Sequence, residues 1–433
     1  MKAKKNSTYI DILLTTVILC MVLNYGFTSF GIRVGPVVFP IVQLIAILGV
    51  FRLILKNIYI FFNRRFIEII ILFVLFFIRI PFDVLKNGVW SLRDGFHYID
   101  MLYVIIAYYE TYSLIKKYSY MKEKILNYIE KGLFLSWLFF VITSVPYLNK
   151  LLIEISPVYN GQQSQIRLFG YVSFLNIWST IYMFWNIYKI IYEKKKGLFY
   201  FIQIYTNLIF VLIGQSRLGI AIVFIFILYF TISGKYKIVG NIIKKIIPFV
   251  VIIITLLLLG LRINLGNRTF DLNYLINLIL STFGKGDNIS KLTGISQRLD
   301  WWREIFLCST SSIGIFIFGR GFGVALTSFK SITGSLVREP HNSFLSVYAR
   351  QGMFGFIIWV KFLLKAVIKF HINFKKTNNK ISMITTLILI GFLICAIAEP
   401  VFESSYSAVP IYSFIGITEA IIVLDKRKED SNG

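Results

Sequence analysis

Long apolar stretches alternate with short polar connections along almost the whole chain. A helix needs roughly 20 apolar residues to cross the hydrocarbon core of a bilayer. Twelve stretches approach that length, and each predicts a membrane-spanning helix. They cover residues 8–26, 36–55, 66–84, 98–116, 132–148, 169–191, 197–214, 218–233, 246–262, 345–369, 381–398 and 408–425. The pattern therefore predicts an all-α, polytopic membrane protein with a single transmembrane domain over residues 1–433.

The polar connections alternate in the basic residues that they carry. Every second connection is rich in lysine, as at Lys194 to Lys196 and around Lys426. Cytoplasmic loops of membrane proteins carry an excess of Lys and Arg. We therefore expect these connections and both termini on the cytoplasmic side of the cell membrane, in a multi-pass topology.

One outer connection, residues 263–344, is far longer than the others. Its stretch 270–280 is apolar enough to lie flat on the membrane, and residues 312–319 are too short to span it. Residues 295–306 predict a helix with one apolar face. That face consists of Ile295, Leu299, Trp302 and Phe306. We therefore expect an extracytoplasmic cap with short helices of its own.

Composition and charge agree with the membrane assignment. Hydrophobic residues make up 57% of the chain and charged residues only 15%, whereas soluble domains carry about 25% charge. The formal net charge of +25 would suggest nucleic acid in a soluble protein. Here it is best explained by cytoplasmic connections that meet anionic lipids. We expect membrane lipids as partners and no nucleic acid.

Arginine, unlike lysine, is concentrated on the predicted outer side. The outer arginines are Arg33, Arg93, Arg167, Arg217, Arg262, Arg268, Arg298, Arg303, Arg320, Arg338 and Arg350. A guanidinium group binds phosphate oxygens two at a time and keeps its charge when partly buried. The sorting therefore indicates a phosphorylated substrate at the outer face, with ion pairs inside the cap as the alternative. Arg167 and Arg217 also border apolar stretches, where a charge is costly and usually paired or functional.

The stretch REPHNSFLSVYARQG, residues 338–352, gathers polar residues at the start of the tenth predicted span. Its His341 is a candidate general base, because neutral imidazole accepts protons near neutral pH. The following Asn342-Ser343 looks like a helix cap, so this histidine could instead only bond the cap. Glu399 and Glu403, in the last outer turn, are the alternative candidate bases.

Other site chemistry is sparse in the outer connections. They contain no Asp-x-Asp and no Cys/His cluster with ligand spacing, so we expect no metal and no cofactor. The segment GRGFG, residues 319–323, predicts either a tight turn or a backbone nest for an anion. Arg79, within an apolar stretch, has Asp83 four residues away as an ion-pair partner.

The order of these motifs resembles the O-antigen polymerase and ligase family, polytopic enzymes that join lipid-linked glycans outside the membrane. The resemblance is carried by RLFG (167–170), SRLG (216–219), RLDWW (298–302), GRGFG (319–323), HNSFL (341–345) and QGMFG (351–355). It covers residues 165–360, whereas the first five spans match only in being spans. The family's Asn-Pro-Asn-like turn after the first arginine has no counterpart in VSFLN, which weakens that part.

The resemblance implies a metal-independent glycosyltransferase that polymerises polyprenyl-diphosphate-linked oligosaccharides into capsular polysaccharide, exopolysaccharide or O-antigen-like glycan. In this interpretation His341 takes the proton of the acceptor hydroxyl. The diphosphate is neutralised by Arg167, Arg217 and Arg298, with Arg320 and Arg338 as secondary candidates. Because one diphosphate must meet both, we expect Arg167 and Arg217 to approach each other.

Two alternative functions stay open at this point. A ligase of the same family would move finished glycan to a different acceptor. A flippase of the lipid-linked unit is less favoured, because transporters tend to show repeated halves and midplane charges. For a polymerase, a separate flippase and a chain-length regulator are the implied protein partners.

Overall fold

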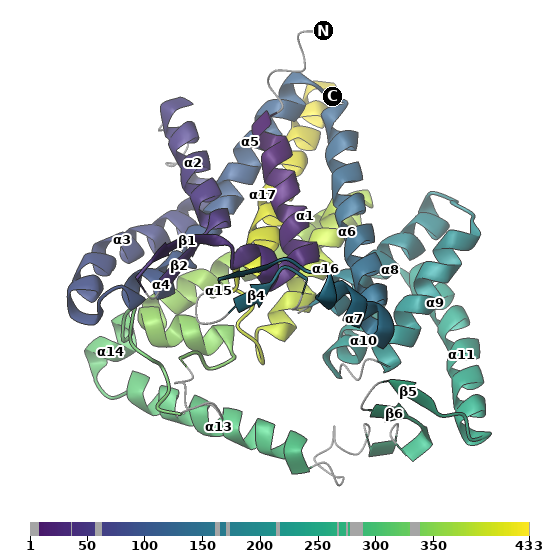
Figure 1. Ribbon diagram of the computed structural model, residues 1–433. Helices are drawn as coiled ribbons and strands as arrows, with labels where there is room; N and C mark the ends of the chain where they lie inside the picture. Colours follow the sequence, from purple (N-terminus) through teal and green to yellow (C-terminus); the bar gives the residue numbers. More distant parts are fainter. Residues whose placement is uncertain are drawn as a thin grey trace. The chain divides into compact units, whose positions relative to one another are not determined.

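Helices form most of the described chain in this computed structural model (Figure 1). The structure describes residues 8–35, 37–56, 63–160, 165–169, 174–213, 217–265, 268–273, 276–277, 289–329 and 338–432. Each of the twelve apolar stretches contains a helix, which confirms that part of the prediction. By length and composition, three described helices suffice to cross a membrane: Met121–Ser144, Tyr236–Leu258 and Ser405–Arg427. The complete set of twelve spans stays a prediction.

The chain divides into two compact units, and the first consists of residues 1–132, 157–171 and 298–433. Its first helices are α1 (Thr8–Thr28), α2 (Ile41–Lys56), α3 (Ile67–Asn87), α4 (Trp90–Phe96) and α5 (Tyr103–Lys117), with 3-10 turns η3 (Arg64–Phe66) and η4 (Ile99–Leu102). The later helices are α14 (Ile313–Phe318), α15 (Ser343–Thr377), α16 (Lys380–Cys395) and α17 (Ser405–Asn432). The unit also holds the first part of α6 (Met121–Ser144) and most of α13 (Ile289–Ser309).

Helix α17 forms the centre of this unit. Its membrane-spanning candidate stretch is 94% buried and packs against α5 and α1. Gly416 allows the close approach to α5, because a Cβ atom there would lie 2.2 Å from the carbonyl oxygen of Val104. The hydroxyl of Tyr412 accepts a hydrogen bond of 3.2 Å from Trp359 Nε1 on α15. Small residues and interhelical hydrogen bonds of this kind are typical of helices packed in membranes.

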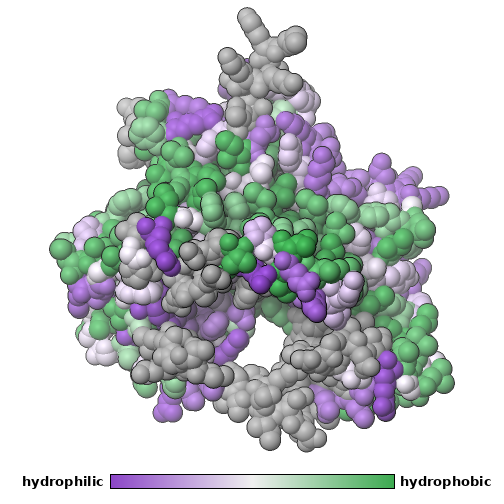
Figure 2. Space-filling model, viewed as in Figure 1, coloured by the Kyte–Doolittle hydropathy of each residue, from purple (hydrophilic) through white to green (hydrophobic). Residues whose placement is uncertain are grey.

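Apolar side chains cover part of the outer surface of the first unit. Phe77, Ile78, Phe82 and Leu85 on α3 are between 55% and 87% exposed. Figure 2 shows apolar residues gathered on the visible surface. Because soluble monomers rarely expose large apolar patches, this surface suits contact with lipid.

The two ends of the first unit carry different sets of charges. One end holds the start of α1 and the end of α17 (Figure 1), and its lysines pair with acids. Lys122 lies 2.8 Å from Asp425, and Lys124 lies 3.4 Å from Asp11. Helices α13 and α14 lie at the opposite end. The predicted cytoplasmic lysines and the predicted outer cap are thus separated along the unit.

We expect a cysteine introduced at Arg303, on α13, to react with a membrane-impermeant thiol reagent in intact cells. A cysteine at Lys376, at the end of α15, is expected to react only after permeabilisation. Both side chains are exposed, so accessibility from the two sides of the membrane is the variable measured. The background is Cys308→Ser, because Cys308 is partly exposed whereas Cys20 and Cys395 are buried. The opposite labelling pattern would invert the topology.

The second unit consists of residues 133–156 and 172–297. It contains the rest of α6, then α7 (Pro146–Glu154), α8 (Leu175–Tyr192), α9 (Leu198–Ile213), α10 (Arg217–Ile232) and α11 (Tyr236–Leu258). Every residue of α8 from Ile177 to Lys189 is buried. Asn186 on this helix donates a hydrogen bond of 3.1 Å to Gln203 on α9. This bond joins two fully buried amide side chains across the α8–α9 contact and so reduces the cost of burying them.

Three short antiparallel hairpins depart from the all-α prediction. The paired strands are β1 (Gly31–Val34) with β2 (Val37–Pro40), β3 (Val158–Asn160) with β4 (Gln165–Arg167), and β5 (Ile263–Leu265) with β6 (Arg268–Phe270). Strands of three or four residues are too short to show a period-two pattern. Arg167 is the last residue of strand β4. The sixth span was expected from residue 169, but its helix, α8, begins only at Leu175.

Two helices begin or break where hydropathy alone does not predict it. Helix α6 begins at Met121 rather than at residue 132, because its first turns are amphipathic and bury Ile125 and Ile129 among polar neighbours. Helix α15 contains a break at Gly352, whose φ is 69°. A Cβ atom at this glycine would lie 2.2 Å from the carbonyl oxygen of Ile317, so the break lets α14 approach α15.

The predicted cap is helical where described, and the predicted apolar face of its longest helix is not the face that is buried. Helix α13 confirms the helix expected over 295–306. Among its described residues, Ile305 and Ser309 are buried, whereas Leu299 and Phe306 are 54% and 55% exposed. Ile305 packs with Leu326 and Ala349, which a helical period alone cannot identify. In the segment 270–280, residues 274–275 and 278–280 lie outside the described residues, so its expected position on the membrane stays a prediction. Residues 263–297 group with the second unit and residues 298–344 with the first.

Candidate functional site

His341 lies immediately before α15 in a left-handed conformation, with φ of 49°. Histidine adopts this region more readily than bulky or β-branched residues do. Asn342 caps the helix, because its Oδ1 accepts a hydrogen bond of 2.9 Å from the backbone N–H of Leu345. The cap predicted from the sequence is thus confirmed for Asn342. On the other side, Trp302 of α13 donates a hydrogen bond of 2.9 Å to the carbonyl of Pro340.

A carboxylate faces one nitrogen of the His341 ring. Nδ1 lies 3.4 Å from Oε2 of Glu399, which is close for an ion pair but long for a hydrogen bond. This nitrogen is buried, although 41% of the His341 side chain is exposed. The exposed edge is therefore the one that carries Nε2. A carboxylate beside Nδ1 favours a hydrogen there and leaves Nε2 free to accept a proton.

Arg298 of α13 holds the same carboxylate from another direction. Its guanidinium donates a hydrogen bond of 2.8 Å to the carbonyl of Ala398 and lies 3.3 Å from Oε1 of Glu399. Glu399 therefore contacts two of the predicted site residues, Arg298 and His341. The side chains of Arg298 and Glu399 are each 33% exposed, so both are accessible to solvent.

Glu403 occupies a more enclosed position in the same turn. Ser343 donates a short hydrogen bond to Oε2 of Glu403, and the same hydroxyl accepts one of 3.1 Å from the backbone N–H of Phe402. The expected role of Ser343 as a helix cap is therefore wrong, because its hydroxyl serves this turn instead. Burial raises the pKa of Glu403 to about 7. Near neutral pH this carboxyl can accordingly hold or release a proton.

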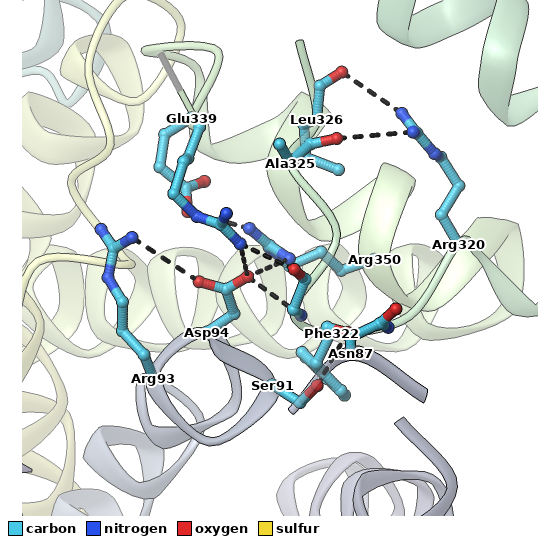
Figure 3. A network of polar contacts seen from close by, with 12 residues as sticks. Asn87, Ser91, Arg93, Asp94, Arg320, Phe322, Ala325, Leu326, Glu339 and Arg350 are labelled. Atoms are coloured by element: carbon cyan, nitrogen blue, oxygen red, sulfur yellow. Dashed lines mark hydrogen bonds and ion pairs between the residues drawn. The ribbon is translucent and has the colours of Figure 1, made fainter. Parts of the chain in front are cut away.

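A second cluster surrounds Asp94 of α4, whose carboxylate is fully buried (Figure 3). Arg350 lies 2.9 Å from it, Arg338 3.4 Å and Arg93 4.0 Å. Arg350 also lies 2.9 Å from Glu339. Burial by itself would raise the pKa of Asp94, but the three guanidinium groups lower it below its ordinary value. The aspartate is therefore charged at neutral pH and holds the arginines by mutual attraction.

The glycine-rich segment 319–323 is both a turn and a backbone nest, and the anions that it binds belong to the chain itself. The backbone N–H of Phe322 donates to Asp83 at 2.8 Å, and that of Gly323 donates to Asp94 at 3.0 Å. Gly321 and Gly323 have φ values of 87° and 84°, which L side chains rarely adopt. The expected pairing of Arg79 with Asp83 is present at 3.2 Å.

The structure describes the other predicted site residues to different extents. Arg320 donates hydrogen bonds to the carbonyls of Leu326 and Ala325 (Figure 3). Arg167 is exposed at the end of β4 in the first unit. Arg217 begins α10 in the second unit, and its side chain lies outside the described part of the chain. The approach of Arg167 to Arg217 stays a prediction.

Sequence reasoning missed the acids that pair with arginines at the predicted outer end of the first unit. Asp94 and Glu339 pair with arginines 244 and 11 residues away in the chain. For Arg93, Arg338 and Arg350, the ion-pair interpretation of the outer arginines is therefore confirmed. The available signal was that each missed acid directly follows an arginine, in RD at 93–94 and RE at 338–339.

Neither metal ligation nor sequence comparison adds a further assignment. Among the described residues, no group of three or more His, Cys, Asp or Glu side chains could hold a metal ion. In comparisons with known proteins, no family model matches the chain, and no curated protein matches it.

Proposed function

We propose that this protein is a membrane glycosyltransferase that polymerises polyprenyl-diphosphate-linked oligosaccharide units on the outer side of the cell membrane. One observation carries the proposal: His341 presents Nε2 outward while Glu399 lies 3.4 Å from its Nδ1, with Arg298 on the same carboxylate. A histidine oriented by a carboxylate is a common arrangement for a general base. The sequence resemblance and the apolar helices support the same assignment.

In the proposed reaction, the acceptor hydroxyl oxygen attacks the anomeric carbon of the donor sugar. Its proton passes to Nε2 of His341, and the bond between that carbon and the diphosphate oxygen breaks. The electron pair leaves with the diphosphate, which needs no proton because it is already a weak base. Glu399 stabilises the imidazolium that forms, and its distance from Nδ1 can shorten when substrate binds. Arg167 and Arg217 are proposed to neutralise the departing diphosphate.

Arg298 fits a positioning role in this proposal. Its guanidinium is engaged by Ala398 and Glu399, so it holds the carboxylate that orients His341. The secondary candidates Arg320 and Arg338 are likewise engaged by backbone carbonyls, and Arg338 also by Asp94. These contacts count against Arg320 and Arg338 as diphosphate ligands.

We expect the purified protein in nanodiscs to convert one lipid-linked repeat unit, isolated from the cells that make it, into a ladder of longer glycans with release of polyprenyl diphosphate. Gel electrophoresis reports chain length, and phosphate analysis of the lipid fraction reports the leaving group. Empty nanodiscs are the control. A single product that appears only when a second, unrelated acceptor is added would indicate a ligase. Transbilayer movement of the unit without diphosphate release would indicate a transporter and contradict the proposal.

A further inference from the structure

A polar cavity of about 210 Å³ lies inside the first unit, apart from the exposed edge of His341. We call it the polar cavity and define it by Gln43, Arg93, His97, Glu339 and Glu403 in its lining. These side chains come from α2, α4, the connection after α4, the segment before α15 and the turn before α17. Five segments that are distant in the chain thus contribute polar side chains to the lining of one cavity.

Each of these five side chains brings a polar atom that has no hydrogen-bond partner within the described chain. The atoms are Gln43 Oε1, Arg93 Nη1, His97 Nδ1, Glu339 Oε2 and Glu403 Oε1, of which Arg93 Nη1 also forms the 4.0 Å ion pair with Asp94. Gln43 is only 1% exposed, and its amide nitrogen is used in a hydrogen bond of 3.4 Å to Ser405. Buried polar atoms are nearly always bonded in folded proteins, so five unbonded ones in side chains that line one cavity indicate that bound water or a ligand completes their bonding.

The chemistry of these atoms favours a neutral, hydroxyl-rich ligand. Arg93 offers a donor, and Gln43 and Glu339 offer acceptors. Burial lowers the pKa of His97 to about 3, so its ring is neutral and both donates and accepts. A diphosphate would meet two carboxyl groups here, and a cation would meet Arg93. A sugar hydroxyl, which donates and accepts at once, suits this mixture of groups.

Aromatic residues supply the apolar part of the lining. Tyr25, Phe96 and Tyr406 line the cavity, and the rings of Tyr25 and Tyr406 meet edge to face with centroids 6.4 Å apart. Small-molecule sites typically combine such apolar surfaces with a few placed polar groups. The volume limits the occupant to a small group, on the scale of one sugar ring rather than an oligosaccharide.

Ser343 connects the polar cavity with the His341–Glu399 pair. Its hydroxyl bonds to Glu403, which lines the cavity, and lies 3.3 Å from the carbonyl oxygen of Glu399. We propose that the polar cavity binds one neutral sugar ring of the acceptor glycan. This inference rests on the proposed function only for the source of the sugar, because the binding chemistry is independent of it.

A cavity-filling variant tests binding directly. Ser29 lines the cavity and is not among the five polar groups, so Ser29→Phe should occupy the space. Saturation-transfer NMR with the protein in nanodiscs would use the methyl glycosides of glucose, galactose and N-acetylglucosamine as probes. We expect at least one to bind the unmodified protein and to lose its signal in Ser29→Phe. The matched control is Ser311→Phe, at an exposed serine, which should retain the signal.

The inference is overturned if none of the three glycosides binds, or if the signal survives in Ser29→Phe. It is also overturned if inorganic diphosphate, whose binding is followed by broadening of its ³¹P signal because it carries no C–H protons, binds to the unmodified protein and not to Ser29→Phe while no sugar binds. In the polymerisation assay, Ser29→Phe should raise KM for the lipid-linked unit about tenfold or more with kcat little changed. Its binding of sugar-free polyprenyl diphosphate should be unchanged.

The two proposals fail in different ways. Sugar binding without polymerisation would contradict the proposed function alone. Polymerisation with unaltered sugar binding in Ser29→Phe would contradict the cavity proposal alone.

Discussion

His341→Gln is expected to reduce polymer formation by about 10²–10⁴-fold, the usual contribution of a general base, while lipid-linked substrate still binds. Glutamine keeps a hydrogen-bonding side chain but cannot accept a proton at working pH. The diphosphate is a good leaving group without protonation, so the loss falls on the attacking hydroxyl. The measurements are the initial rate of polymerisation and the retention of radiolabelled lipid-linked unit on the nanodisc-bound variant.

Two further variants make this experiment specific. His341→Asn preserves the left-handed backbone, because asparagine adopts positive φ readily. Agreement between the Asn and Gln variants therefore removes backbone strain as the cause. His371→Gln, near the opposite end of α15, is the control and should polymerise at close to the normal rate. If His341→Gln also does so, His341 only positions substrate. Glu403, whose pKa burial raises to about 7, then becomes a better candidate base than Glu399.

Asp94→Asn is expected to destabilise the first unit by about 3–5 kcal/mol, the range measured when one partner of a buried ion pair is removed. The change leaves Arg350, which is 2% exposed, beside a neutral amide. It also removes the charge that holds Arg338 and Arg93. Thermal unfolding in detergent, followed by circular dichroism, should show a clear fall in Tm.

The matched control for this change is Glu154→Gln, another carboxylate-to-amide replacement. Glu154 lies on α7, 3.9 Å from Lys150, and both side chains are well exposed. Exposed pairs of this kind contribute about 0–1 kcal/mol. An Asp94→Asn protein as stable as this control would mean that the three arginines do not depend on Asp94.

The stability of the Asp94 cluster should also depend on pH in a known direction. Arginines lower the pKa of Asp94 in the folded protein below the ordinary value of 3.8. The contribution of the aspartate is therefore fully present above that value and is lost as the pH falls through the folded-state pKa. This acid-sensitive part of the unfolding curve should be absent from Asp94→Asn.

The local features of this protein were readable from its sequence. Twelve apolar stretches predicted helices, and each contains one, because hydropathy and the helical period act over neighbouring residues. The cap at Asn342 and the pair between Arg79 and Asp83 involve residues three and four positions apart. The backbone nest at residues 319–323 follows from glycines that tolerate positive φ.

The partners of the charged residues were decided only by tertiary structure. His341 meets Glu399, and Asp94 meets Arg338 and Arg350, across separations that no periodic pattern encodes. The same holds for α13, where contacts with Leu326 and Ala349 bury Ile305 and leave the predicted apolar face outside. Periodicity predicts which face of a single helix is apolar, whereas the burial of a charge depends on which other helices pack around it. The sequence by itself thus determined the helices and the candidate histidine, and the packing of those helices decided which acid lies beside it.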